Sequence, residues 1–188
     1  MDSSEKSDNQ LMREFSECSR AAFNLIARRY QKRLFNFLLR GLIKDRDQAE
    51  DIVQQTLIKI YENKFTYRQS HQFSTWAYTI CRNYALNLLR DNHRADIGSV
   101  FDEEGPADLS ESFMDKIENS ETSAIIKKVL GSLDSKYREV ITMRFLDELS
   151  YEEISQITGK GINTLKSLCR RGLGIIRNEL EEMKVEQA

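Results

Sequence analysis

The residues best suited to chemistry in this 188-residue chain form one polar stripe between positions 76 and 94. If successive residues of a helix turn by about 100°, one tryptophan, two amides and two guanidiniums fall within roughly 60° of one another. Amides and guanidiniums hydrogen-bond to base edges and phosphates, and aromatic rings stack on unpaired bases. The same spacing is equally typical of a core tryptophan beside a solvated face. The stripe consists of Trp76, Asn83, Asn87, Arg90 and Arg94.

A second polar group lies on the second helix of a predicted helix-turn-helix near the C-terminus. Residues 150–153 read Ser-Tyr-Glu-Glu, which has the spacing of a capping box, and a break containing two glycines follows at 158–161. The next helix, predicted over 162–183, begins with polar and basic residues, which favours DNA recognition over an ordinary helical hairpin. Its first turns carry Asn163, Thr164, Lys166, Ser167, Arg170 and Arg171.

The elements that position these groups are helices according to the apolar periodicity. Apolar residues at three- and four-residue steps predict helices over about 23–38, 45–63, 73–94, 121–132, 135–146, 150–157 and 162–183. We therefore expect an all-α fold of two small helical domains joined by a flexible acidic linker, the second a four-helix domain containing the helix-turn-helix. The expected parts are a polar N-terminal arm (1–19), a first domain (20–95), the linker (96–120) and a second domain (121–188).

The net charge of −2 is a cancellation between segments of opposite sign. Residues 20–94 hold 14 basic and 6 acidic residues (+8), whereas residues 95–120 hold 1 basic and 8 acidic residues (−7). The second domain holds 11 of each and is neutral. A segment of +8 indicates a polyanionic partner, most simply nucleic acid.

Composition argues against several other classes of protein. The chain has no run of eighteen apolar residues and its start is polar, so we expect a soluble, cytoplasmic protein without membrane insertion. Three dispersed cysteines and two histidines make a disulfide framework or a metal site improbable, and we expect no cofactor. The phosphate-cradling and zinc-protease motifs are absent from the sequence, so we do not expect an enzyme.

Two blocks of sequence resemble bacterial RNA polymerase sigma factors of the extracytoplasmic-function (ECF) subfamily. The first block is DQAEDIVQQTLIKIY (47–61) with FSTWAYTICRNYALNLLR (73–90). The second is YREVITMRF (137–145) with LSYEEI (149–154) and TLKS (164–167). Together they cover nearly all of the chain beyond residue 20, in the order found in that family.

This resemblance implies a role for each part of the chain. The helix near 47–61 would bind the clamp coiled coil of core RNA polymerase through Asp51, Gln54 and Gln55. The loop and helix that follow would recognise and melt the −10 promoter element, with the loop capturing a flipped base. The residues implied there are Tyr67, Arg68, Phe73, Trp76, Arg82, Asn83, Asn87, Arg90 and Arg94. The second domain would dock on the polymerase flap and read the −35 element with Lys160, Asn163, Thr164, Lys166, Ser167, Arg170 and Arg171.

The chain departs from the family pattern at four positions. Asn87 stands where the family usually has Asp, Lys160 where it has an apolar residue, Gly161 where it often has Ser, and Leu168 where it has Arg. The loss of a guanidinium at 168 puts the affinity for the −35 element in doubt.

The resemblance also implies a chain that is monomeric when free and bound by an anti-sigma factor, with the acidic linker inside the polymerase cleft. The alternative is a freestanding helix-turn-helix regulator that binds operators as a dimer.

Overall fold

The structure is a computed structural model that describes residues 6–67, 72–95 and 121–186. Every regular element in these ranges is helical, which confirms the all-α prediction. The N-terminal domain contains α1 (Asp8–Ser16), α2 (Arg20–Gly41), α3 (Arg46–Glu62), a 3₁₀ turn η1 (Lys64–Thr66) and α4 (Phe73–Ala95). The C-terminal domain contains α5 (Glu121–Ser132), α6 (Ser135–Ile141), a π-helical turn η4 (Thr142–Leu146), α7 (Tyr151–Thr158) and α8 (Ile162–Glu186). The acidic linker lies outside the described residues.

The first helix, α1, corrects the prediction of a polar arm. Leu11, Met12 and Phe15 of α1 are fully buried, and the helix opens with a capping box between Ser7 and Gln10. Asp8 fixes α1 to α2, since its carboxylate accepts hydrogen bonds from the Arg29 guanidinium and the Tyr30 hydroxyl. The expected polar arm over residues 1–19 is therefore wrong for residues 8–16, which form part of the core.

Helices α2, α3 and α4 follow the predicted apolar periodicity. Asp45 caps α3, and its side chain accepts a hydrogen bond of 2.8 Å from the backbone N–H of Gln48. The buried face of α3 includes Ile52, Val53 and Ile60, and α4 packs against this helix. Lys59 also places its ammonium group 4.6 Å from the centre of the Tyr84 ring, which joins the exposed edges of α3 and α4.

In the C-terminal domain, a close approach between α6 and α8 depends on a glycine. A Cβ atom at Gly172 would lie 2.5 Å from Cδ1 of Ile141 and 3.2 Å from Cβ of Tyr137. Gly174, two residues further along α8, has no atom within 4 Å of the equivalent position. The absence of a side chain at residue 172 thus sets how closely α6 packs on α8.

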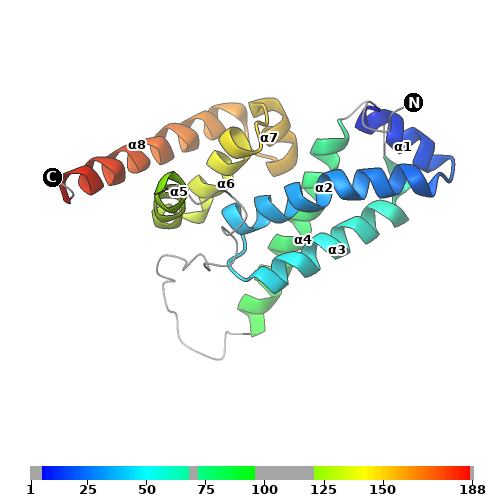
Figure 1. Ribbon diagram of the computed structural model, residues 1–188, viewed down its shortest axis with the longest axis horizontal. Helices are drawn as coiled ribbons and strands as arrows, with labels where there is room; N and C mark the ends of the chain where they lie inside the picture. The colour runs from blue at the N-terminus through cyan, green and yellow to red at the C-terminus, as the bar shows by residue number, and fades with distance from the viewer. Residues whose placement is uncertain (1–5, 68–71, 96–120, 187–188) are drawn as a thin grey trace.

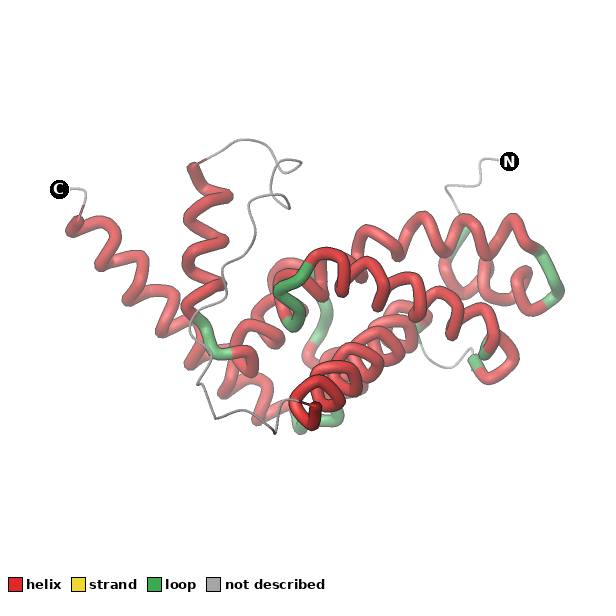
Figure 2. Tube along the Cα trace, turned by 90° about the horizontal axis from the view of Figure 1, so that it is seen from below, coloured by secondary structure: helices red, strands yellow, loops and turns green. Residues whose placement is uncertain are grey.

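The two domains pack directly against each other. Helix α4 contacts α7, and α2 contacts α6 and η4. Buried apolar residues of the C-terminal domain, among them Met143 and Ile154, belong to the same cluster as the core of the N-terminal domain. Figure 1 shows α6 and α7 beside α2 and α4, and the turned view of Figure 2 shows the same neighbours. In the described part of the chain, no helix has the length and apolar character needed to cross a bilayer.

The packing at Gly172 predicts opposite effects for two alanine substitutions on α8. Gly172→Ala lowers the free energy of unfolding by about 1 kcal/mol, because overpacking costs about 1–3 kcal/mol and outweighs the gain in helix propensity. Gly174→Ala raises the free energy of unfolding by about 0.5–1 kcal/mol, because nothing obstructs the new methyl group. Urea unfolding monitored by circular dichroism measures both values. Equal changes in the two variants would contradict the close contact.

Candidate nucleic-acid interface

The C-terminal domain presents a helix-turn-helix built as the sequence predicts. The Ser150 side chain accepts a hydrogen bond from the Glu153 backbone N–H, and the Glu153 carboxylate accepts one of 2.8 Å from the Ser150 backbone N–H. Gly159 is the C-cap of α7, and its φ of 70° lies in the left-handed region that favours glycine. The capping box and this glycine therefore set the direction in which α8 leaves the turn.

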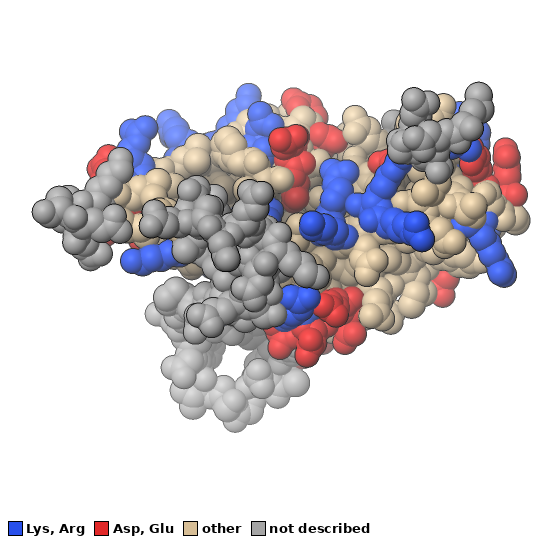
Figure 3. Space-filling view, viewed as in Figure 1, with Lys and Arg blue, Asp and Glu red and all other residues tan. Residues whose placement is uncertain are grey.

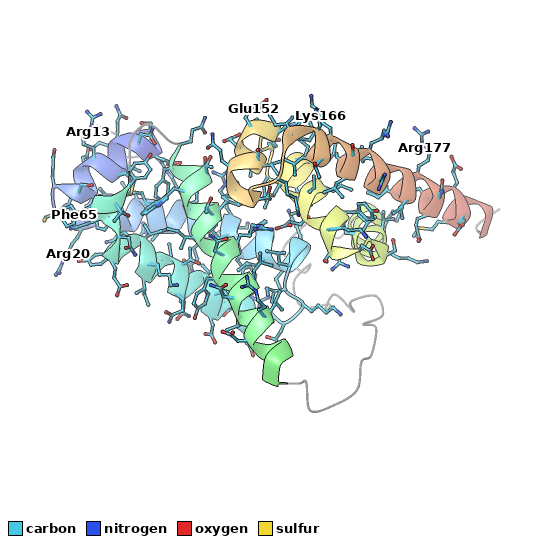
Figure 4. The ribbon with its side chains drawn as sticks, turned by 180° about the vertical axis from the view of Figure 1, so that it is seen from behind. Arg13, Arg20, Phe65, Glu152, Lys166 and Arg177 are labelled. Atoms are coloured by element: carbon cyan, nitrogen blue, oxygen red, sulfur yellow. The ribbon has the colours of Figure 1, made fainter. Side chains whose placement is uncertain are left out.

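The start of α8 separates a buried face from an exposed polar face. Leu165 and Cys169 are buried in the core, and Leu168 is half-buried against it, so the residue that replaces the family's arginine serves packing. Figure 4 shows Glu152, Lys166 and Arg177 along the outer edge formed by α7 and α8. The exposed polar face of α8 consists of Asn163, Thr164, Lys166, Ser167, Arg170 and Arg171.

In the N-terminal domain, Tyr67, Phe73 and Trp76 form an aromatic cluster. The Tyr67 ring lies 5.3 Å from the Trp76 ring and 5.9 Å from the Phe73 ring, measured between centroids. The Tyr67 hydroxyl donates a hydrogen bond of 2.7 Å to Oδ1 of Asn9 in α1. Burial, and then the charge of Asp8, raise the pKa of Tyr67, so this hydroxyl stays protonated at neutral pH.

Two members of the cluster are accessible and the third is not. Tyr67 and Trp76 are half-buried, whereas Phe73 is enclosed by Tyr30 in an edge-to-face contact of 4.8 Å. Phe73 therefore supports the other two rings and has no free face for a base. Phe65, which sequence reasoning did not single out, is 75% exposed. The sequence could have indicated Phe65, because it is an aromatic residue in a polar loop.

The exposed face of α4 keeps most of the predicted polar stripe together. Asn83, Asn87 and Arg90 are exposed, and Trp76 lies toward the start of the same helix. Arg94 lies in α4, but its side chain is outside the described part of the chain, and Arg68 lies outside the described residues altogether. The remaining predicted residue, Arg82, faces the other domain.

Three side chains from the two domains meet at a buried carboxylate, and we call Arg82, Glu139 and Lys160 the Glu139 cluster. The Arg82 guanidinium donates from Nε to Oε1 of Glu139 over 2.5 Å and from Nη2 to Oε2 over 3.4 Å. The Lys160 ammonium group lies 3.8 Å from Oε2 of the same residue. The Glu139 side chain is 5% exposed and that of Arg82 is 12% exposed. The family resemblance implies DNA as the partner of both cations, and Glu139 was not singled out in the sequence.

Helix α3 presents a third surface, which we call the α3 stripe: Asp51, Gln54, Gln55 and Ile58. All four side chains are exposed, and they lie opposite the buried face of the helix. Ile58 is 47% exposed, a large apolar side chain among polar ones that sequence reasoning missed.

Figure 3 shows acidic side chains gathered where α3 begins and basic side chains over α2 and along α8. The described residues contain no group of acidic, histidine and cysteine side chains that is suited to a metal ion.

Comparison with known proteins identifies the family of each domain. Residues 26–95 match the family model described as Sigma-70 region 2, and residues 123–174 match Sigma-70, region 4. The chain is 30% identical over 149 residues to RNA polymerase sigma factor SigV of Bacillus subtilis, covering 79% of this chain and 86% of SigV. It is 29% identical over 184 residues to the ECF RNA polymerase sigma-E factor of Haemophilus influenzae, covering 94% of this chain and 96% of that factor. The chain belongs to the ECF subfamily of RNA polymerase sigma factors.

Two solved structures have the same fold. The sigma factor RpoE of Bartonella quintana, solved with the anti-sigma factor NepR, superposes with a TM-score of 0.68 at 27% identity, over 85% of this chain and 96% of that chain. CnrH, solved with the cytosolic domain of CnrY, superposes with a TM-score of 0.66 at 17% identity, over 94% of this chain and 99% of that chain. This sigma factor is thus a transcription initiation factor with regions 2 and 4, and the freestanding regulator is not favoured.

A buried acid near the contact between regions 2 and 4 predicts a pH-dependent stability. Burial raises the pKa of Asp147 to about 6, although Arg40 and Arg33 act to lower it. Because this pKa is raised on folding, the stabilisation is complete below about pH 4 and is lost as the pH rises through about 6. Relative to Asp147→Asn, the wild-type chain should lose on the order of 1–2 kcal/mol over that range. Urea unfolding of both chains between pH 4 and 7 measures the difference, and parallel profiles would contradict it.

Proposed function

We propose that region 2 of this sigma factor binds core polymerase through the α3 stripe. The exposure of Ile58 beside polar residues supports this role, since large exposed apolar side chains are typical of protein interfaces. Asp51, Gln54 and Gln55 match the positions that face the clamp coiled coil in the family. In this proposal, Ile58 is the apolar centre of the contact.

The exposed face of α4 and the aromatic cluster would recognise and melt the −10 element. Asn83, Asn87 and Arg90 offer hydrogen bonds to base edges and phosphates, and the accessible rings are those of Phe65, Tyr67 and Trp76. Extruding a base costs a few kcal/mol in unstacking, and stacking on an aromatic ring returns about 1–3 kcal/mol per base. Accessible aromatic rings near the start of α4 are therefore suited to stacking on a base that leaves the duplex when the −10 element melts.

The observation that carries the proposal for region 4 is the exposed polar face at the start of α8, directly after a capped helix and a glycine turn. In such an arrangement, the helix N-terminus and its side chains would lie in the major groove of the −35 element. Docking on the polymerase flap is part of the same proposal. The protein would act by binding alone, with no catalysis of its own, as a cytoplasmic monomer when free.

An anti-sigma factor is a further proposed partner. The two structural relatives described above were both solved with other proteins, one of which is named an anti-sigma factor. For the acidic linker, which lies outside the described residues, we propose a position in the polymerase cleft, where its charge would imitate that of nucleic acid.

Reconstituted transcription tests the polymerase contact. The full chain added to core RNA polymerase should produce transcripts from a supercoiled promoter library. Ile58→Glu should weaken core binding at least about tenfold, because it places an unpaired charge in an apolar contact. Gln31→Glu adds the same charge at an exposed site on α2 and serves as the control. Dimeric binding to DNA without any transcription would instead support the freestanding regulator.

Salt dependence tests the region 4 surface. If Arg170 or Arg171 binds a phosphate, its replacement by Ala should reduce the slope of log K against log salt by about 0.9 for each phosphate that is no longer neutralised. Holoenzyme binding to a fluorescent promoter duplex, measured at several salt concentrations, gives this slope. Lys128→Ala removes an exposed cation from α5 and should leave the slope unchanged. An unaltered slope in all three variants would place the DNA on another face.

A further inference from the structure

Helix α1 contacts both elements that carry the aromatic residues of the proposed −10 site, the 3₁₀ turn η1 and helix α4. Figure 4 shows Arg13 of α1 and Phe65 of η1 at the same end of the molecule. The match to Sigma-70 region 2 begins at residue 26, so α1 lies outside it. The structure therefore brings an element with no assigned role into contact with the place where a base would be captured.

The short segment that contains η1 is fixed to α1 at both of its ends. At the start of the segment, the ammonium group of Lys64 lies 4.9 Å from the centre of the Phe15 ring in α1. At its end, the Tyr67 hydroxyl donates a hydrogen bond of 2.7 Å to Oδ1 of Asn9. Phe65 lies between these two contacts and is 75% exposed. Helix α1 thus determines where the segment begins and ends, and the exposed ring projects from between the two fixed points.

The contact at Asn9 completes a closed circuit of contacts through α1, α2 and α4. Asp8, the neighbour of Asn9, accepts a hydrogen bond from the Tyr30 hydroxyl. The Tyr30 ring meets the Phe73 ring edge to face at 4.8 Å, and the Phe73 ring lies 5.9 Å from the Tyr67 ring. A tyrosine side chain has two rotatable angles, so holding its hydroxyl and its ring fixes both of them. Tyr67 is therefore oriented before any ligand binds.

This orientation leaves the ring of Tyr67 as the part that can meet a base. A tyrosine hydroxyl has one hydrogen to donate, and that of Tyr67 is already donated to Asn9. The ring is half-buried beside that of Trp76, with 5.3 Å between centroids. Stacking uses the face that every base has, so it holds a base without selecting which one. A ring that is already ordered also loses less conformational entropy when the base arrives.

We propose that Asn9 is a positioning residue for base capture, and that its side chain holds the Tyr67 ring in the orientation in which the ring stacks on a base extruded from the −10 element. Asn9 acts through Tyr67 and not by touching the DNA. This inference rests on the proposed function, and it adds helix α1 to the site that captures the base.

The test measures how much the captured base contributes to binding. Holoenzyme is titrated, with fluorescence anisotropy as the readout, into a single strand carrying the −10 element of a promoter recovered from the transcription library. Each base of the element is then replaced in turn by an abasic site. We define the base effect as the affinity for the intact strand divided by the affinity for the abasic strand. At the captured base, the wild-type chain should show a base effect on the order of tenfold, as expected for one stacked base.

Two variants break the contact from opposite sides. Asn9→Leu removes the acceptor, and Tyr67→Phe removes the donor but keeps the ring. Each should lower the base effect about fivefold, because a ring that is free in the unbound state must be ordered on binding. The double variant should lose no more than either single variant, since the same contact is lost. Asn9→Asp keeps an acceptor oxygen and should retain the wild-type base effect.

The base effect separates positioning from a general structural role. A residue that only stabilised the fold would change the affinities for the intact and abasic strands equally and leave their ratio unchanged. Asn24→Leu makes the same substitution at an exposed site on α2, and Tyr61→Phe removes a hydroxyl from an exposed ring on α3. Both controls should retain the wild-type base effect. A similar loss in the controls would overturn the proposal.

The outcomes distinguish this inference from the proposed function. A wild-type base effect that persists in Asn9→Leu and Tyr67→Phe would overturn the inference and leave base capture by region 2 in place. If no abasic site weakens wild-type binding by more than about twofold, base capture itself is rejected. Tyr67→Phe leaves α1 unaltered, so it provides the answer by itself if Asn9→Leu folds poorly.

Discussion

The apolar surface of α4 is buried from two sides, by α3 within region 2 and by α7 of region 4. This double burial is the constraint on which the rest of the arrangement depends. Because two opposite faces of α4 are packed, only a narrow face remains for the residues that would meet promoter DNA. Asn83, Asn87 and Arg90 lie on that face, whereas Arg82 lies on the side packed against region 4. A single helix thus supplies the face proposed to bind DNA, a core face and an interface between domains.

The local parts of the fold were predictable because they depend on residues that are close in sequence. Apolar steps of three and four residues indicate the helices, and Ser150 with Glu153 indicates the start of α7. Helix α1 was not predicted from the sequence, because polar residues dominate the composition of the first nineteen residues. The capping-box spacing of Ser7 and Gln10 and the apolar residues Leu11 and Phe15 are nevertheless present in the sequence. The spacing of these residues, more than their composition, is the signal for this helix.

The candidate site was predictable only where a residue's role follows from its own helix. The exposed face of α8 is such a case, since Leu165 and Cys169 fix which side is buried. Phe73 and Phe65 are the opposite case, because both are aromatic residues near one loop and periodicity does not tell which is enclosed. Tyr30, from another helix, decides that Phe73 is buried. Arg82 and Glu139 are 57 residues apart, so no local pattern indicates their pairing.

The neutral charge of region 4 acquires a structural explanation from the same contact. Glu139 is one of eleven acids that balance eleven bases in residues 121–188, and in the structure its charge is paired with Arg82 and Lys160. Region 4 alone therefore has little electrostatic affinity for DNA. A segment with as many residues as 96–120 spans at most about 80–90 Å when fully extended, and elements about 25 base pairs apart are separated by on the order of 80 Å along the duplex. In the proposed function, binding of region 2 to the promoter would supply region 4 at a high effective concentration, and a neutral region 4 would then engage the −35 element with the help of polymerase and region 2.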